Sequence, residues 1–268
     1  MEPDRWRQRA GSFGPAADLY DQVRPGYPVA AVEWALAPLG AGRWRILDIG
    51  AGTGIMTRLL ISLGHDMVAV EPDEQMRQRL AATTTAVEPL AGRAEALPLA
   101  DASVDAAIAA QAYHWFDRDR AHLELGRVIR PGGVFTALWN DRDEETAWVR
   151  VYSRIVEGDR GPDGSSADSG RAKSPSYGDR FGPAEFAEFR HAVTHTPESL
   201  VALLKSRSYF LTAPPTRQAA LEAEVRELAA THPELAGRTS FDLPYVTVVY
   251  RATRLPAPSS LGTSATKS

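Results

Sequence analysis

Short apolar runs alternate with amphipathic segments along the first half of the chain. The first run ends at a glycine cluster and the second at Glu71, and apolar positions at helical spacing follow them. Strands and helices that alternate in this way are typical of βαβ units, and they predict a parallel sheet with helices on both faces. The predicted strands cover residues 45–49, 67–70, 87–90, 104–110 and 134–139, and the predicted helices cover 29–39, 55–64, 73–83 and 117–130.

The second half of the chain follows a different pattern. Glycine, serine, aspartate and proline are frequent over residues 158–180, which predicts a long loop. Small and polar residues from Pro256 onward predict a disordered tail. Helices are predicted over 141–157 and over 197–236 with a break at Pro214 and Pro215, and strands over 186–193 and 245–251.

Composition narrows the classes of protein to consider. The chain has 268 residues, of which 44% are hydrophobic, and this is enough for one α/β domain with a small addition. A net charge of -4 argues against nonspecific binding to nucleic acid or to an anionic membrane. Without cysteine there is no thiolate nucleophile and no disulfide. We also expect no membrane span and no secretory signal, and therefore a cytoplasmic location.

A glycine cluster carries the first chemical signal. Gly50, Gly52 and Gly54 lie between an apolar strand and a helix, where glycine permits a tight turn and close approach of a ligand. Glu71 ends the next strand, and an acid there accepts hydrogen bonds from both ribose hydroxyls of an adenosine. The spacing differs from the Gly-x-Gly-x-x-Gly of dinucleotide enzymes, and Asp48 precedes it. A tight turn without a ligand is the alternative.

Four segments together resemble a known family. Residues 46–54, 70–76, 92–99 and 131–133 are similar, in order and spacing, to the class I S-adenosylmethionine-dependent methyltransferases. The resemblance is to the small-molecule methyltransferase group that includes trans-aconitate methyltransferase-like enzymes. It implies a Rossmann-like doubly wound α/β sheet, mostly parallel with an antiparallel last strand, and a helical lid inserted in the C-terminal half. It also implies methyl transfer from S-adenosyl-L-methionine to a small-molecule acceptor by in-line displacement.

The resemblance further assigns a cofactor-binding set. Glu71 would bind the ribose, Pro72 and Met76 would flank the adenine, and Arg93 departs from the aspartate that many relatives carry next to Ala94. An ordinary core position is the equal alternative for Met76. The full expected set is Tyr20, Arg24, Asp48, Gly50, Ala51, Gly52, Thr53, Gly54, Glu71, Pro72, Met76, Ala94, Glu95, Gln111 and Ala112.

The segment after the fourth predicted strand should face the methyl group, because ligands lie at the carboxyl ends of strands in open α/β sheets. His114 is the candidate catalytic residue there, as a base or as an orienting group, with a structural histidine as the alternative. Tyr20 and Arg24 belong to a candidate flap over the cofactor, with a solvated arginine in a proline turn as the alternative. The candidate substrate residues are Trp115, Trp139, Arg207 and Tyr209, and packing is the alternative for each.

The predicted organisation has four parts. These are a flap over residues 1–30, a cofactor-binding core over 31–140, the rest of the sheet with the lid over 141–255, and a tail over 256–268. We expect no metal site, and a monomer or a homodimer. Two alternatives in function remain: a catalytically inactive binding or regulatory module, and a nicotinamide-dependent oxidoreductase. A nucleic-acid methyltransferase is disfavoured, because this chain lacks the motif that such enzymes usually carry after the fourth strand.

Overall fold

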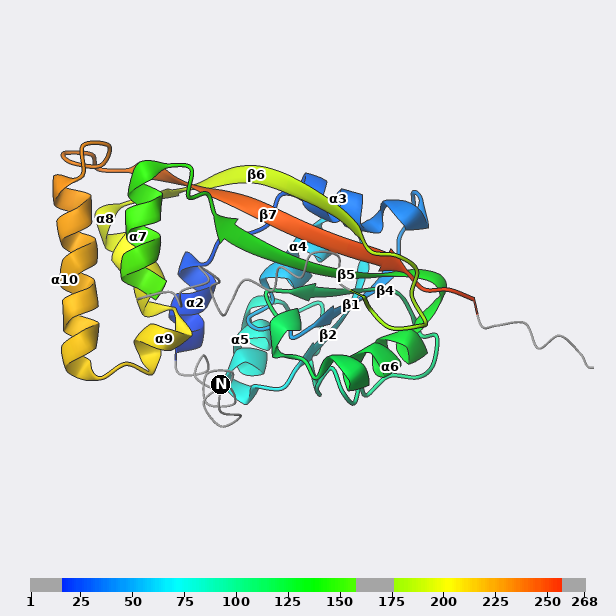
Figure 1. Ribbon diagram of the computed structural model, residues 1–268. Helices are drawn as coiled ribbons and strands as arrows, with labels where there is room; N and C mark the ends of the chain where they lie inside the picture. The colour runs from blue at the N-terminus through cyan, green and yellow to red at the C-terminus, as the bar shows by residue number, and fades with distance from the viewer. Residues whose placement is uncertain (1–15, 158–175, 257–268) are drawn as a thin grey trace, which may run out of the picture.

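A seven-stranded sheet forms the centre of the protein (Figure 1). The computed structural model describes residues 16–157 and 176–256. The strand order is β3-β2-β1-β4-β5-β7-β6; β7 runs antiparallel to both of its neighbours, and the other pairs are parallel. The predicted fold class is therefore confirmed. The strands are β1 Arg45–Ile49, β2 Asp66–Glu71, β3 Leu90–Ala91, β4 Val104–Ala110, β5 Ile129–Arg142, β6 Glu185–His195 and β7 Phe241–Thr253.

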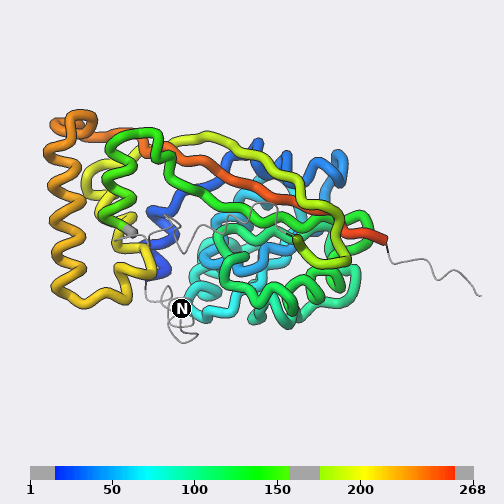
Figure 2. The backbone as a smooth tube through the Cα atoms, in the orientation of Figure 1, coloured from blue at the N-terminus to red at the C-terminus, as the bar shows by residue number. Residues whose placement is uncertain are grey.

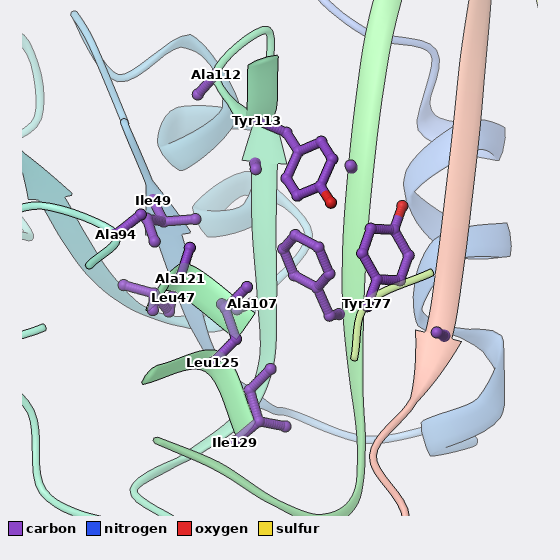
Figure 3. Packing of buried hydrophobic residues seen from close by; sticks show 14 of the residues in the cluster. Leu47, Ile49, Ala94, Ala107, Ala112, Tyr113, Ala121, Leu125, Ile129 and Tyr177 are labelled. Carbon is purple, nitrogen blue, oxygen red and sulfur yellow. The ribbon is translucent and has the colours of Figure 1, made fainter. Parts of the chain in front are cut away.

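Alternation along the strands divides the core into two layers. Side chains of successive strand residues point to opposite faces, so Leu47 packs with Leu125 on one face while Ile46 packs with Val32 and Leu60 on the other. Figure 3 shows part of the first layer. The helices that cover the sheet are α3 Val29–Leu36, α4 Ile55–Ser62, α5 Glu74–Thr83 and α6 Arg118–Val128, with short 3₁₀ turns η2 Ala37–Leu39 and η3 Tyr113–Trp115.

Four further helices form a group at one end of the molecule (Figure 1). They surround a second apolar cluster, which includes Tyr152, Leu204 and Val225, and β6 and β7 run side by side from the sheet into this group (Figure 2). Helix α2 Ala17–Val23 lies between the two parts and contacts both α5 and α8. The helices of the group, which we call the lid, are α7 Ala147–Glu157, α8 Pro197–Lys205, α9 Ser208–Leu211 and α10 Pro215–Thr231.

Some element boundaries differ from the sequence prediction. The prediction ended the fifth strand at residue 139 and began a helix at 141, whereas β5 continues to Arg142 and α7 begins at Ala147. The reason is a tertiary one, because Asn140 and Arg142 pair with Thr247 and Tyr245 of β7. The third strand, predicted over 87–90, is Leu90–Ala91 and keeps only Leu90 of the prediction. The predicted helical stretch 197–236 is three helices that end at Thr231.

Candidate functional site

A cavity of about 870 Å³ opens at the carboxyl ends of the central strands. Its wall is built from the glycine loop, the ends of β2, β4 and β5, the segment 92–96, helix α2 and the lid residues 207–209. Pockets for small molecules commonly lie at this edge of an open α/β sheet and commonly have volumes of roughly 300–1,000 Å³. Position and size therefore mark this cavity as the candidate active site.

The three glycines of the loop serve different purposes. All have positive φ, at +67° for Gly50, +56° for Gly52 and +88° for Gly54. A Cβ on Gly50 would lie 2.7 Å from the side chain of Ala112, and one on Gly54 would lie 2.8 Å from Leu80. A Cβ on Gly52 would meet nothing within 4 Å. Packing therefore requires Gly50 and Gly54, whereas Gly52 leaves its backbone open to the cavity.

Glu71 ties the end of β2 to the glycine loop. The backbone N–H of Gly52 donates to Oε2 and that of Asp73 donates to Oε1, both at 2.8 Å. Burial raises the pKa of the Glu71 carboxyl from 4.5 to about 7, although these two donors favour the ionised form. A carboxylate offers about four lone-pair positions. The two that remain can accept further donors from a ligand in the cavity that Glu71 lines.

Asp48 lies behind the cavity wall. It is 1% exposed and accepts a hydrogen bond from the Thr57 hydroxyl at 2.6 Å, while its Oδ1 has no hydrogen bond among the described residues. Burial raises its pKa to about 6. Ala51, Thr53 and Gly54 are likewise absent from the cavity wall. These four expected cofactor residues therefore shape the loop from beneath it.

The residues expected to surround the adenine lie together on the cavity wall. Pro72, Met76, Ala94 and Glu95 all face the cavity, as does Arg93. Met76 is 4% exposed, so it is a core residue and a wall residue at once. The Glu95 carboxylate accepts a hydrogen bond from the backbone N–H of Asp117 at 2.8 Å. This bond holds the segment 92–96 against the start of α6.

The segment after β4 forms another part of the cavity wall. Gln111 has φ of +56°, which is uncommon for a residue with a side chain, and its amide donates to the carbonyl of Asn140 at 3.2 Å. Gln111, Ala112, His114 and Trp115 line the cavity. The indole N–H of Trp139 donates to Nδ1 of His114 at 3.2 Å. Trp139 itself is 3% exposed and lies behind the histidine, not on the cavity wall.

Helix α2 and the lid close the remaining side. Tyr20, Arg24, Arg207 and Tyr209 line the cavity. The Arg24 guanidinium lies over the Tyr20 ring and donates to the hydroxyl and to the carbonyl of Ser206, at 3.1 and 2.9 Å. Burial and the neighbouring Arg207 lower the pKa of Arg24. Arg24 therefore connects α2 to the lid and adds positive charge to this end. Residues 1–15 of the predicted flap, most of the predicted loop 158–180 and residues 257–268 of the predicted tail lie outside the described residues.

Sequence reasoning missed several residues of the cavity wall. Asp141 and Arg142 lie there because β5 runs three residues beyond its predicted end. Asp117 and Arg120 lie there because α6 begins beside the cavity, with Asp117 as its N-cap. The N-cap pattern after the fourth strand was a usable signal for the second pair. Nothing local indicated the first pair, which depends on the pairing of β5 with β7.

Comparison with known proteins finds methyltransferases over most of the chain. A methyltransferase-domain profile matches residues 47–137. An uncharacterised methyltransferase of Mycobacterium tuberculosis is 41% identical over 92% of this chain and 97% of its own length. An uncharacterised methyltransferase-like protein of Schizosaccharomyces pombe is 31% identical over 89% and 93%. The structure of a putative type II methyltransferase from Anaeromyxobacter dehalogenans matches with 27% identity and a TM-score of 0.62, over 87% of this chain and 99% of the other.

The chain belongs to the class I S-adenosylmethionine-dependent methyltransferases, and it is an enzyme of that class. The residues present fit the cofactor: Gly52 leaves room along the backbone, Glu71 retains acceptor positions, and Met76 and Ala94 offer an apolar surface. Over residues 16–157 and 176–256, no group of three or more histidine, aspartate and glutamate residues is arranged for a metal ion. No helix in these two ranges is long and apolar enough to cross a membrane.

Proposed function

We propose that the enzyme transfers a methyl group to a small-molecule acceptor that enters the cavity on the side of α2 and the lid. The observation that carries this proposal is the continuity of the cavity. One space is lined both by Glu71 and Met76, which we expect at the cofactor, and by Arg207 and Tyr209 of the lid. Its volume of about 870 Å³ supports a small acceptor beside the cofactor, within the usual range for ligand pockets.

The cofactor-binding residues would act by holding the cofactor in one position. Gly50, Gly52 and the backbone around them would run along the methionine and ribose, Glu71 would accept the ribose hydroxyls, and the segment 92–96 would hold the adenine against Met76. When bound, S-adenosylmethionine supplies a methyl group on a positively charged sulfur, which an acceptor atom displaces in line. The protein has to orient the acceptor and exclude water, and both tasks can supply a large part of the rate.

The acceptor residues come from three separate parts of the chain. His114 and Trp115 follow β4, Asp141 and Arg142 end β5, and Arg207 is the N-cap of α9. The aromatic and arginine side chains would orient an acceptor with both apolar and polar parts. The acidic net charge of -4 supports a small molecule over a nucleic acid as the acceptor.

Two binding titrations and one labelling experiment test the proposal. We expect S-adenosylhomocysteine to bind to the purified protein and NADH not to bind. Incubation with methyl-labelled S-adenosylmethionine and a cell extract should place the label in the small-molecule fraction. Binding of NADH without S-adenosylhomocysteine would overturn the assignment of the cavity. Binding of S-adenosylhomocysteine with no label in that fraction would favour a binding or regulatory module, and label in nucleic acid or protein would contradict a small-molecule acceptor.

A further inference from the structure

The hydrogen bond between Trp139 and His114 fixes the chemistry of the histidine. Trp139 comes from the carboxyl-terminal part of β5, and its ring makes edge contacts with Tyr113 and Tyr250, each with ring centroids 6.2 Å apart. The indole is 3% exposed, so it has no room to turn away. Its N–H points to Nδ1 of His114 at 3.2 Å. The histidine is half-buried and lines the cavity.

An indole nitrogen is a donor only. Nδ1 of His114 must therefore be the acceptor in this bond, and it cannot carry a proton while the bond exists. In a neutral imidazole one ring nitrogen holds the proton and the other is free of it. The proton of neutral His114 accordingly lies on Nε2. The tautomer follows from the chemistry of the partner, which is a firmer basis than the position of a hydrogen atom.

We infer that His114 presents its Nε2–H to the methyl acceptor as a hydrogen-bond donor, and that Trp139 is the positioning residue that imposes this state. The inference rests on the proposed function and replaces the general-base hypothesis for His114. A base needs an available lone pair. In His114 the Nδ1 lone pair accepts from Trp139 and Nε2 is protonated, so the ring has none to offer.

This assignment defines what the acceptor presents at His114. The group that reaches Nε2–H has to offer a lone pair, as a carboxylate, carbonyl or hydroxyl oxygen or a neutral nitrogen does, whereas an ammonium group has donors only. A protonated Nδ1 would likewise face the indole N–H and would break the bond to Trp139. His114 therefore selects for an acceptor that arrives with a lone pair available at this point.

Nitrogen-15 NMR of the histidine rings tests the tautomer directly. The spectrum is recorded at pH 7.5 for the protein alone and with S-adenosylhomocysteine, and the His114 signals are assigned by their loss in His114→Gln. We expect a protonated Nε2 and an unprotonated Nδ1. Trp139→Phe should shift the His114 signals toward a mixture of tautomers. Trp148→Phe is the matched control, because Trp148 is an equally buried tryptophan that packs on Phe241 in the lid.

The activity of two His114 variants distinguishes a hydrogen-bond donor from a general base at this position. The side-chain amide of glutamine can replace the Nε2–H donor, whereas glutamate supplies a base and no donor. Once an acceptor is found, we expect His114→Gln to keep kcat within about tenfold of wild type and His114→Glu to lose at least a hundredfold. The opposite order, or a His114 protonated at Nδ1 in the NMR spectrum, would overturn the inference. Should Trp139→Phe fail to fold, the wild-type spectrum and the two His114 variants still test whether His114 is a donor or a base.

The tautomer is measured without any acceptor. Failure to find a methylated small molecule would therefore contradict the proposed function and leave the protonation state of His114 standing. A wrong tautomer together with active methyl transfer would contradict the inference alone.

Discussion

The two ends of the cavity are built in different ways. The cofactor end comes from residues close together in the sequence: Gly52 bonds to Glu71, 19 positions away, and both belong to adjacent strand ends. The lid end comes from distant parts of the chain, as in the bonds between Arg24 and Ser206, 182 positions apart.

The chemistry of the two ends also differs. Backbone groups and the small side chains of a tight loop form much of the cofactor end, whereas arginine, tyrosine and tryptophan side chains dominate the lid end. A loop that depends on glycine leaves little freedom for substitution. Side chains on a lid can change without disturbing the sheet. The comparison suggests that the cofactor end defines the class of reaction and that the lid end defines the acceptor.

The largest effect should come from Gly52→Val. The new side chain would project into the cavity, and a β-branched residue at φ of +56° also strains the loop. We expect the affinity for S-adenosylhomocysteine to fall at least a hundredfold, a loss of about 3 kcal/mol, in calorimetric titration. Gly64→Val is the control, since Gly64 has φ of +88° but lies outside the cavity. Equal affinities for Gly52→Val and wild type would place the cofactor elsewhere.

The next effect concerns the proton on Glu71. Because burial raises its pKa from 4.5 to about 7, the folded protein holds this proton more tightly than the unfolded chain does. The corresponding stabilisation is complete below pH 4.5 and is lost as the pH rises through 7. At about 1.4 kcal/mol per pKa unit, it amounts to roughly 3 kcal/mol. Glu71→Gln should therefore flatten the decline of the melting temperature over this pH range in the cofactor-free protein.

Cofactor binding should show the opposite trend with pH. Ribose hydroxyls donate to the ionised carboxylate, so the affinity for S-adenosylhomocysteine should rise about tenfold between pH 6 and 8, with release of a proton. Calorimetry in two buffers of different ionisation enthalpy measures that proton. Asp48→Asn should keep the trend, because Asp48 is not part of the cavity wall. A Glu71→Gln variant that still releases the proton would show that another group titrates.

The same contrast explains what could be predicted from the sequence. Gly50, Gly52, Glu71 and Met76 could be located because each belongs to a short motif whose spacing the backbone itself requires. Strand pairing and the helical lid, by contrast, depend on contacts between distant residues. The extension of β5 to Arg142 requires Tyr245 of β7 as its pairing partner, and no sequence pattern near Arg142 predicts that pairing.

Individual roles were harder to predict than positions. The sequence placed His114 at the cavity but left its function open between a base and an orienting group, because that function depends on Trp139 in β5, 25 positions away. It placed Trp139 among the substrate residues, where the structure has it supporting His114 from behind. The arginine at position 24 was expected to pair with the cofactor, and its observed hydrogen bonds go to Ser206.

A smaller effect should come from Arg24→Met, which removes both bonds to Ser206. A buried group that loses its partner costs about 1–3 kcal/mol. We expect the opening free energy of α8, measured by hydrogen exchange, to fall by that amount, with little change in β1 and β2. Ser206→Ala is the matched variant; it removes the hydroxyl but keeps the carbonyl contact, so its effect should be smaller. An equal loss of protection in β1 would mean that α2 stabilises the whole domain, contrary to a local connection with the lid.

The smallest effect should come from Lys205→Met. Lys205 and Glu222 form an ion pair of 2.9 Å between α8 and α10, with side chains 38% and 27% exposed. Solvent screens such a pair, which contributes about 0–1 kcal/mol, and urea denaturation of Lys205→Met and of Glu222→Gln should show changes within that range. The lid helices are held instead by the apolar cluster that contains Leu204 and Val225. A loss above about 2 kcal/mol would exceed what a screened pair supplies. The lid would then depend on polar contacts as its junction with α2 does, and the acceptor end would be more sensitive to salt than the cofactor end.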